Sequence, residues 1–466
     1  MTVNKDNDIK ELFLEKGFNA LNDNYEILKR LGKGSFGNVY QVKQKTTGEY
    51  RACKKISKLI LEDEMKYKKE IDILIKADHP NILKLYGIYE TTRSVYLITE
   101  ECKGGTLLNR ILENIEKKSE FSEKQACELF LQIMSGIAYL HSNGICHRDI
   151  KLENILYLCP RKANNNTLKL VDFGFGNFFK KGKKLETKLG SAYYIAPEVL
   201  DGNYNEKCDI WSAGVILFFL LCGRLPFYGN SEEQIYGYIK KMKYQIPPEK
   251  INKISGDAKD LISHMLTSED KRYSAEDVLS HPWFKNSNKI PLVNLDFDPK
   301  FLLDYKDRDI FQKITLACLA SKLNTEQIQN LVDIFKGFDV NNDGNISFKE
   351  FRQGLLQLNQ NNLNEGEIKA IFSAIDLDHS GSIAYTEFLA VCMRKCKYLK
   401  QEKIFEAFSV FDKENTGFIK REDIIYVLNK EIKRENMEKN VDDIIKKLDQ
   451  NKDGKISYKE FCSFLE

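Results

Sequence analysis

A glycine-rich segment near the N-terminus has the spacing of a phosphate-binding loop. Three glycines in a G-x-G-x-x-G-x-V pattern let the backbone approach phosphate oxygens without a clash from a Cβ atom. A dinucleotide-binding fold uses a similar pattern, but there the loop leads from a strand into a helix. Here strand-like segments lie on both sides, which favours a hairpin that covers a nucleotide. The candidate nucleotide-binding residues of the segment are Leu31, Gly32, Lys33, Gly34, Ser35, Phe36, Gly37, Asn38 and Val39.

Four twelve-residue stretches in the C-terminal third are rich in side-chain oxygens, recur at nearly equal intervals, and have glycine at the sixth position. Calcium prefers six to eight oxygen ligands, with a glutamate that closes the loop at position twelve. The repeat therefore predicts four EF-hand loops, at 339–350, 376–387, 412–423 and 449–460. The candidate ligands are Asp339, Asn341, Asp343, Asn345 and Glu350; Asp376, Asp378, Ser380, Ser382 and Glu387; Asp412, Glu414, Thr416 and Asp423; and Asp449, Asn451, Asp453, Lys455 and Glu460.

The third of these loops departs from the pattern at two positions. Asp423 stands at position twelve, where its side chain is one methylene shorter than that of glutamate. Lys420 places a cation at position nine. Because the closing ligand must reach the ion with both oxygens, we expect this to be the weakest of the four calcium sites.

Several motifs after the glycine-rich segment follow one another in a fixed order. They are Arg51-Ala-Cys-Lys54, Glu70 on a predicted helix, His147-Arg-Asp-Ile-Lys-Leu-Glu-Asn154, Asp172-Phe-Gly174 and Ala196-Pro-Glu198. Any single lysine–glutamate pair is usually a solvated surface pair. Together, however, the motifs resemble the ordered signature of protein kinases over residues 25–283.

The resemblance implies a role for each polar residue of the set. Phosphoryl transfer needs positioning and charge neutralisation more than covalent chemistry. The implied catalytic residues are Lys54 and its partner Glu70 at the α- and β-phosphates of ATP, Asp149 at the substrate hydroxyl, Lys151 at the γ-phosphate, and Asn154 and Asp172 as Mg²⁺ ligands. The implied adenine-binding residues are Ala52, Glu100 and Cys102.

The resemblance also bears on the class of substrate. The segments Lys151–Asn154 and Gly190–Ile195 resemble those of serine/threonine kinases, not tyrosine kinases, so proteins with serine or threonine are the expected substrates. Glu153 is positioned to meet a basic residue of the substrate. Thr106, however, stands where many relatives that prefer arginine carry glutamate, which argues against a strong requirement for arginine.

The elements that must position these residues change character along the chain. Strand-like segments and one helix, at about 62–77, precede residue 100, and mainly helical patterns follow to residue 283. We therefore expect an α+β chain: an N-terminal extension (1–24), a bilobal protein kinase fold (25–283), a junction or autoregulatory segment (284–324), and an all-α calmodulin-like domain of four EF-hands (325–466). Residues 310–323 read as an apolar-faced helix of the junction.

Composition excludes several other classes of protein. The net charge of +3 over 466 residues argues against a nucleic-acid partner. The longest dense apolar run, Val215–Cys222, is far shorter than the roughly 20 residues that span a bilayer, and no signal-peptide core or membrane anchor is evident. The 11 scattered cysteines form no C-x-x-C pair and fit reduced packing thiols. We expect a cytoplasmic monomer.

A kinase joined through a short junction to four EF-hands resembles the calcium-dependent protein kinases of plants and protists. The resemblance implies ATP, Mg²⁺ and Ca²⁺ as cofactors, and a junction helix that inhibits the kinase until the EF-hands take hold of it. A calcium-binding scaffold and a calcium buffer are the alternative functions. Intact Lys54, Asp149 and Asp172 disfavour the scaffold, and the attached kinase disfavours the buffer.

Overall fold

The computed structural model describes residues 11, 13–18, 20–34, 37–58, 64–163, 166–180, 182–187, 190–286, 292, 297, 299–358, 363–393, 401–414, 416–428 and 437–465. Two candidate nucleotide-binding residues, Ser35 and Phe36, lie outside this set, as does part of the junction.

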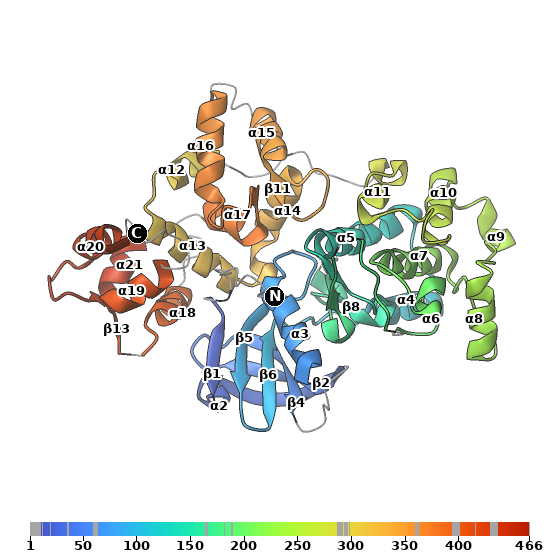
Figure 1. Cartoon of the computed structure of the whole chain (residues 1–466), viewed down its shortest axis with the longest axis horizontal. Helices are drawn as coiled ribbons and strands as arrows, with labels where there is room; N and C mark the ends of the chain where they lie inside the picture. The colour runs from blue at the N-terminus through green and yellow to red at the C-terminus, as the bar shows by residue number, and fades with distance from the viewer. Residues whose placement is uncertain are drawn as a thin grey trace.

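A six-stranded sheet forms the N-terminal lobe, in the order β1-β5-β6-β4-β3-β2, with helix α3 beside it (Figure 1). The bounds are β1 Glu15–Phe18, β2 Tyr25–Gly34, β3 Gly37–Gln44, β4 Tyr50–Ser57, α3 Glu64–Lys76, β5 Leu85–Glu90 and β6 Ser94–Thr99; the short helix α2 spans Leu21–Asn24. The predicted strands at 25–31, 38–42, 50–56 and 94–99 and the helix at 62–77 are confirmed. Strands β1 and β5 were not expected from the sequence.

Strand β1 comes from the segment before the predicted kinase domain and pairs in parallel with β5. The carboxylate of Glu15 accepts hydrogen bonds from the hydroxyls of Tyr25 (2.8 Å) and Tyr89 (2.9 Å) and from the side-chain amide of Gln44 (3.2 Å). These contacts fasten β1 to three other strands, so the sheet extends beyond the segment that carries the kinase motifs.

A mainly helical lobe follows, shown in green in Figure 1. Its elements are α4 Leu107–Glu116, α5 Glu123–Ser142, β7 Ile145–Cys146, β8 Ile155–Tyr157, β9 Leu168–Leu170, β10 Asn177–Phe178, α6 Pro197–Asp201, α7 Lys207–Cys222, α8 Glu232–Lys240, α9 Pro248–Ile251, α10 Gly256–Met265 and α11 Ala275–Leu279. Helix α7 is buried on nearly all sides, which explains its apolar run. Among the described residues, no helix is both long and apolar enough to cross a bilayer.

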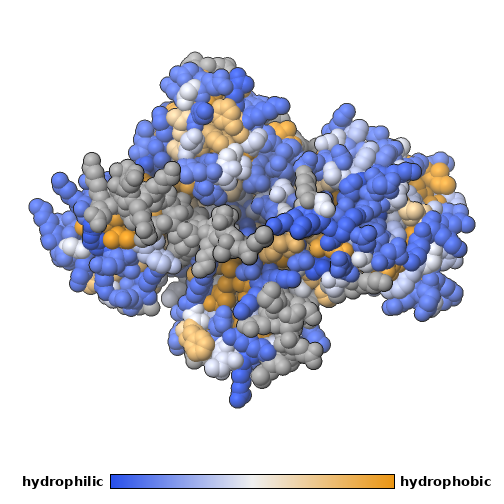
Figure 2. Space-filling view, in the orientation of Figure 1, coloured by the Kyte–Doolittle hydropathy of each residue, from blue (hydrophilic) through white to orange (hydrophobic). Residues whose placement is uncertain are grey.

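Two pairs of helix–loop–helix units form the C-terminal third. The first pair contains α14 Gln329–Phe338, β11 Ile346–Ser347, α15 Phe348–Gln357, α16 Glu365–Ile375, β12 Ser382–Ile383 and α17 Tyr385–Cys392. The second contains α18 Gln401–Phe411, β13 Phe418–Ile419, α19 Arg421–Leu428, α20 Met437–Leu448, β14 Ile456–Ser457 and α21 Tyr458–Leu465. Strand β11 pairs with β12, and β13 with β14, so the loops of each pair lie back to back. In the space-filling view of the whole molecule, hydrophilic residues cover much of the side that faces the viewer (Figure 2).

The junction contributes two helices, α12 Lys300–Lys306 and α13 Ile310–Lys322. Asp309 caps α13 through a reciprocal capping box with Gln312, which fixes where the helix begins. Helix α13, yellow in Figure 1, contacts α17 of the first EF-hand pair and α18 of the second. Its Phe311, Ile314 and Leu319 are completely buried in a core shared with both pairs. The predicted helix at 310–323 is confirmed, and the EF-hands enclose it.

Candidate active site and calcium-binding loops

A cleft of about 430 Å³ is lined by residues of both lobes. Most of the predicted nucleotide-binding residues line it: Leu31, Gly32, Lys33, Gly34, Val39, Ala52, Lys54, Glu100 and Cys102. Gly37 and Asn38 are not among the described lining residues; they pair with Gly34 and Lys33 across the β2–β3 hairpin. Sequence reasoning missed the apolar wall formed by Leu74, Leu83, Leu97, Leu156 and Val171. Its only signal was the ordinary apolar pattern of strands and helices.

Three elements bring charged side chains together at the inner end of this cleft. The Nζ atom of Lys54, on β4, lies 2.6 Å from Oε1 of Glu70 on α3 and 3.0 Å from Oδ1 of Asp172. Burial alone would lower the pKa of Lys54, but the two carboxylates raise it, so the ammonium remains charged. Asp172 takes a left-handed backbone conformation (φ 65°), which is uncommon for a residue other than glycine. The predicted ion pair is therefore formed.

The catalytic-loop residues form a second polar cluster. Oδ2 of Asp149 lies 2.6 Å from Nζ of Lys151 and accepts a hydrogen bond of 2.8 Å from Nδ2 of Asn154. The hydroxyl of Ser191 donates to Oδ1 of Asp149 (3.2 Å) and accepts from Lys151 (3.1 Å). Sequence reasoning missed this contact of Ser191, which no motif spacing signals.

A buried carboxylate anchors this loop from below. Asp209, on α7, accepts hydrogen bonds from the backbone N–H groups of His147 and Arg148, both at 2.8 Å, and lies 3.0 Å from Nε2 of His141. Burial opposes ionisation, but these hydrogen bonds outweigh it and hold the pKa of Asp209 below its usual value. Arg148 has a positive φ of 65°, which the two anchored N–H groups stabilise.

The donor set of the cleft fits a hard divalent cation. Asn154 uses Nδ2 to hold Asp149, which leaves its amide oxygen as the atom suited to a metal. Asp172 supplies carboxylate oxygen, and oxygen is the ligand that Mg²⁺ prefers. The residues present are therefore compatible with an ATP–Mg²⁺ site.

Loops one, two and four close in the same way. In the first loop, Oε1 of Glu350 accepts the backbone N–H groups of positions two and three, both at 3.1 Å. Glu387 does the same in the second loop and Glu460 in the fourth. Carboxylate oxygens of Asp376, Asp378 and Glu387 lie within 4.8 Å of one another. Such a gathering of anionic oxygens suits Ca²⁺.

The third loop lacks this closure among its described residues. Asp423 accepts a hydrogen bond from the N–H of Lys420 (2.9 Å), but the N–H of Lys413, at position two, donates to Phe411 instead. The ammonium of Lys420 lies 2.5 Å from the carboxylate of Glu414, a candidate ligand at position three. The short acidic side chain does not span the loop, and a lysine competes with the cation for an oxygen ligand.

The four loops should therefore bind calcium unequally. Glu350→Gln and Glu387→Gln each remove a charged ligand from a loop that closes, and should weaken calcium binding at that loop by about tenfold. Asp423→Asn should change the total binding isotherm least, whereas Asp423→Glu should add affinity by restoring the reach. Calorimetric titration of the full chain measures all four variants. A larger loss from Asp423→Asn than from the two glutamate variants would contradict the order.

Comparisons with known proteins agree with this geometry. Residues 25–284 match the protein kinase domain, and residues 328–393 and 401–466 each match the EF-hand domain pair. Calcium-dependent protein kinase 3 of Plasmodium berghei is 37% identical over 460 residues, which cover 96% of this chain and 81% of the relative. Calcium-dependent protein kinase 17 of Arabidopsis thaliana is 38% identical over 450 residues, covering 95% of this chain and 83% of the relative.

A similar match extends to calcium-dependent protein kinase 5 of Plasmodium falciparum, 36% identical over 465 residues, or 98% of this chain and 80% of the relative. Both halves of the molecule, and the junction that joins them, are therefore shared with these proteins. The chain belongs to the calcium-dependent protein kinases, a family of calcium-activated serine/threonine kinases.

Proposed function

We propose that the cleft transfers the γ-phosphate of ATP to serine or threonine hydroxyls of proteins through the residues named above, under the control of the EF-hands. The observation that carries this proposal is the joint presence of the Lys54–Glu70–Asp172 ion pairs and the Asp149 cluster in one cleft. Measurement of protein phosphorylation with calcium, and then with a calcium chelator, tests the proposal directly.

We assign each residue the role that the resemblance to protein kinases implies, and the contacts support these roles. ATP with Mg²⁺ supplies the phosphoryl group and offsets the charge of its oxygens. Lys54, directed by Glu70, holds the α- and β-phosphates. Asp149 orients the substrate hydroxyl and accepts its proton, while Lys151, 2.6 Å from that carboxylate, neutralises charge on the γ-phosphate side. Asn154 and Asp172 would hold the metal. The Ser191 hydroxyl keeps Asp149 and Lys151 in register.

We propose four parts of the chain: an N-terminal extension (1–24), the kinase domain (25–283), the junction (284–324) and the EF-hand domain (325–466). Strand β1, in the extension, belongs to the sheet of the kinase lobe. Thr106 caps helix α4 by accepting the N–H of Asn109 at 3.0 Å and has no carboxylate to offer a substrate arginine, so we propose that Glu153, which lines the cleft, meets a basic residue of the substrate. The described cysteines are free thiols, which fits a cytoplasmic protein, and we propose that it acts as a monomer.

Regulation would act through direct contacts between the EF-hands and the loop that follows α3. The carboxylate of Asp78 accepts hydrogen bonds from the backbone N–H (2.9 Å) and the hydroxyl (2.7 Å) of Thr386. Thr386 precedes Glu387, the closing ligand of the second calcium loop. Gly344 of the first loop lies so near the kinase that a Cβ there would come 2.3 Å from Cδ2 of His79. Two calcium loops thus touch the loop that continues from the helix of Glu70.

The end of the junction helix is held on the same side of the kinase. The hydroxyl of Tyr86 (3.2 Å) and the ammonium of Lys84 (3.1 Å) both donate to the carbonyl oxygen of Leu323. Thr325 donates to Oε2 of Glu100, the candidate adenine-binding residue, at 3.1 Å. We infer that this is the active arrangement, in which the EF-hands keep α13 away from substrate. Without calcium, α13 and its neighbours would lie against the kinase and inhibit it.

Replacement of the catalytic carboxylate tests the first part of the proposal. Asp149→Asn should lower the phosphorylation rate by about 100-fold or more, because the hydroxyl loses its positioned base. Binding of ATP, followed by calorimetry, should be nearly unchanged. Lys54→Met should lower the rate by misplacing the phosphates. Wild-type turnover in both variants would show that the active site lies elsewhere.

Replacement of the contact residue tests the coupling to calcium. Asp78→Asn should raise the calcium concentration for half-maximal activity by about tenfold, because hydrogen bonds to a charged acceptor are lost only from the docked state. Calcium binding by the first two loops should weaken in parallel. Asp201→Asn, which disturbs only an exposed pair with Lys240, is the matched control. An unchanged calcium response in Asp78→Asn would separate this contact from activation.

Shortened chains test whether the junction inhibits. A chain that ends at Asn286 should be active and insensitive to calcium, because it lacks both the junction helices and the EF-hands. A chain that ends at Leu323 should stay inhibited at every calcium concentration. Activity assays over a calcium series compare the two. Equal activity in both chains would rule out an inhibitory junction.

A further inference from the structure

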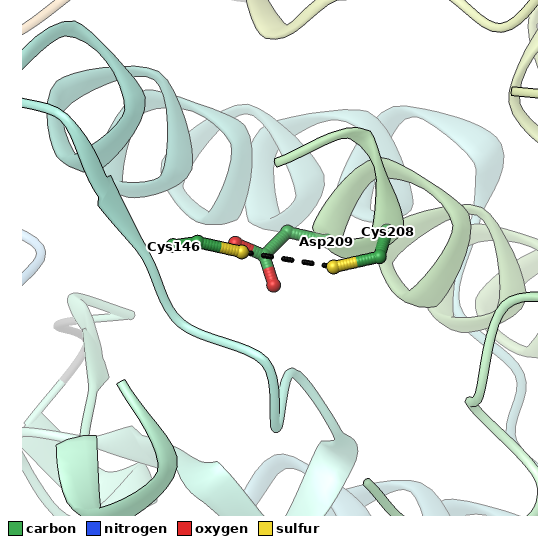
Figure 3. Close-up of side chains that lie close together, drawn as sticks. All are labelled: Cys146, Cys208 and Asp209. Atoms are coloured by element: carbon green, nitrogen blue, oxygen red, sulfur yellow. Dashed lines mark hydrogen bonds between the residues drawn. The ribbon is translucent and has the colours of Figure 1, made fainter. Parts of the chain in front are cut away.

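Two cysteines that no step of the reaction uses lie next to each other beneath the catalytic loop. Cys146 is the last residue of β7 and directly precedes His147. Cys208 lies in the first turn of α7 and directly precedes Asp209. Their sulfur atoms are 3.6 Å apart, and Figure 3 shows them pointing toward each other beside the Asp209 carboxylate. A disulfide needs about 2.05 Å between sulfurs, so a local approach of about 1.5 Å would join them.

The two thiols differ in their access to solvent. Cys146 is 0% exposed and Cys208 is 4% exposed. Cys208 also lines a narrow hollow together with Asp149, Gly190 and Ser191. The hollow has about 10 Å³ of solvent-accessible space, about enough for one water-sized molecule. A small oxidant can therefore reach Cys208 from the substrate side of the cleft, whereas Cys146 is reached only through its neighbour.

The thiols also differ chemically. The hydrogen bond that Cys208 receives from Cys146 lowers the pKa of Cys208, although burial still leaves it above the usual value. Burial raises the pKa of Cys146 further, and its hydrogen bond to Cys208 and the nearby Asp209 carboxylate add to the rise. Because Cys208 lines the hollow and Cys146 is not among its described lining residues, Cys208 is the sulfur that meets an oxidant first and Cys146 is the thiol that resolves the product.

We propose that Cys146 and Cys208 form a disulfide when the kinase meets a hydroperoxide, and that this oxidation slows phosphoryl transfer. The Cys208 sulfur attacks one oxygen of hydrogen peroxide, the O–O bond breaks, and the departing hydroxide takes the proton of the Cys208 thiol to become water. The Cys146 sulfur then attacks the sulfenic acid of Cys208, the S–O bond breaks, and a second water leaves. Two thiols and one peroxide thus give one disulfide and two waters.

The consequence for the reaction follows from the position of Asp209. Its carboxylate accepts hydrogen bonds from the backbone N–H groups of His147 and Arg148. Asp209 directly follows Cys208, and His147 directly follows Cys146, so these hydrogen bonds connect the two chain segments that carry the cysteines. Drawing the sulfurs together shifts the start of the catalytic loop against α7. Asp149 lies two residues beyond His147, so its position relative to Lys151 and substrate changes while the nucleotide wall, formed mainly by the other lobe, does not. Oxidation should therefore lower kcat much more than it raises the KM for ATP.

The same cluster fits a metal ion less well than a disulfide. Three donors, Cys146, Cys208 and Asp209, lie close enough to share an ion. The Asp209 oxygens, however, already accept two backbone hydrogen bonds and lie beside His141. A metal would have to displace contacts that anchor the catalytic loop, whereas a disulfide between the two sulfurs needs no ligand from Asp209.

Peroxide treatment of the full chain at saturating calcium and ATP tests the proposal. The reduced enzyme should lose about 100-fold in kcat, the range expected when a reacting group moves by about 1 Å, and a dithiol should restore it. Peptide mapping of the oxidised wild-type chain should find Cys146 joined to Cys208. Cys208→Ser and Cys146→Ser should each resist inactivation, and Cys462→Ser, a partly buried cysteine in α21, should behave like the wild type.

The mapping needs no variant, so the proposal can be tested even if a serine substitution prevents folding. Absence of the Cys146–Cys208 bond in inactivated enzyme would overturn the proposal. So would equal, dithiol-reversible inactivation of the wild type and the two serine variants, since another thiol would then be responsible. Formation of the Cys146–Cys208 disulfide without a fall in kcat would show that the oxidation does not regulate phosphoryl transfer.

Discussion

The ion pair between Lys54 and Glu70 is the interaction on which the rest of this molecule depends, because it joins strand β4 of the sheet to helix α3. Helix α3 carries Glu70 near its middle, and the loop that leaves its C-terminal end carries Asp78. The middle of the helix thus meets Lys54, and the loop that follows the helix meets Thr386 of an EF-hand. A two-state element that both sites bias is the physical requirement for coupling between them. The proposed regulation needs no long chain of intermediates, since a single helix lies between calcium loop and active site.

The energetic demand on the EF-hands is considerable. A shift from one active molecule in a hundred to ninety-nine in a hundred needs about 5.5 kcal/mol of differential calcium binding. Three loops that close through a glutamate can share this demand. The third loop, with Lys420 bound to Glu414, is expected to contribute less to it. Enclosure of α13 between both pairs explains how unequal sites act together, because opening either pair exposes the same Phe311 and Leu319.

Sequence reasoning named most of the residues that the structure brings together in the cleft and in the calcium loops. It did not predict the contacts that connect the cleft to the calcium loops. Lys54, Asp149, Asp172 and the calcium loops stand out because their chemistry demands certain residue types at certain spacings. The helix that begins after Asp309 follows from its cap and its apolar face. The contact of Asp78 with Thr386 joins residues 308 positions apart; Thr386 belongs to the second calcium loop, but Asp78 belongs to no motif. Strand β5 and Ser191 were missed for the same reason: their partners are set by the tertiary fold, which a local pattern does not encode.

Strand β1 changes what counts as the smallest stable kinase unit in this chain. A fragment that begins at Tyr25, as the kinase motifs alone would suggest, removes the parallel partner of β5 and leaves the phenols of Tyr25 and Tyr89 without the Glu15 carboxylate. The uncovered edge of β5 then presents unpaired N–H and C=O groups to other chains, a known route to sheet-to-sheet aggregation. Strand β1 therefore protects this edge of the sheet from pairing with other chains.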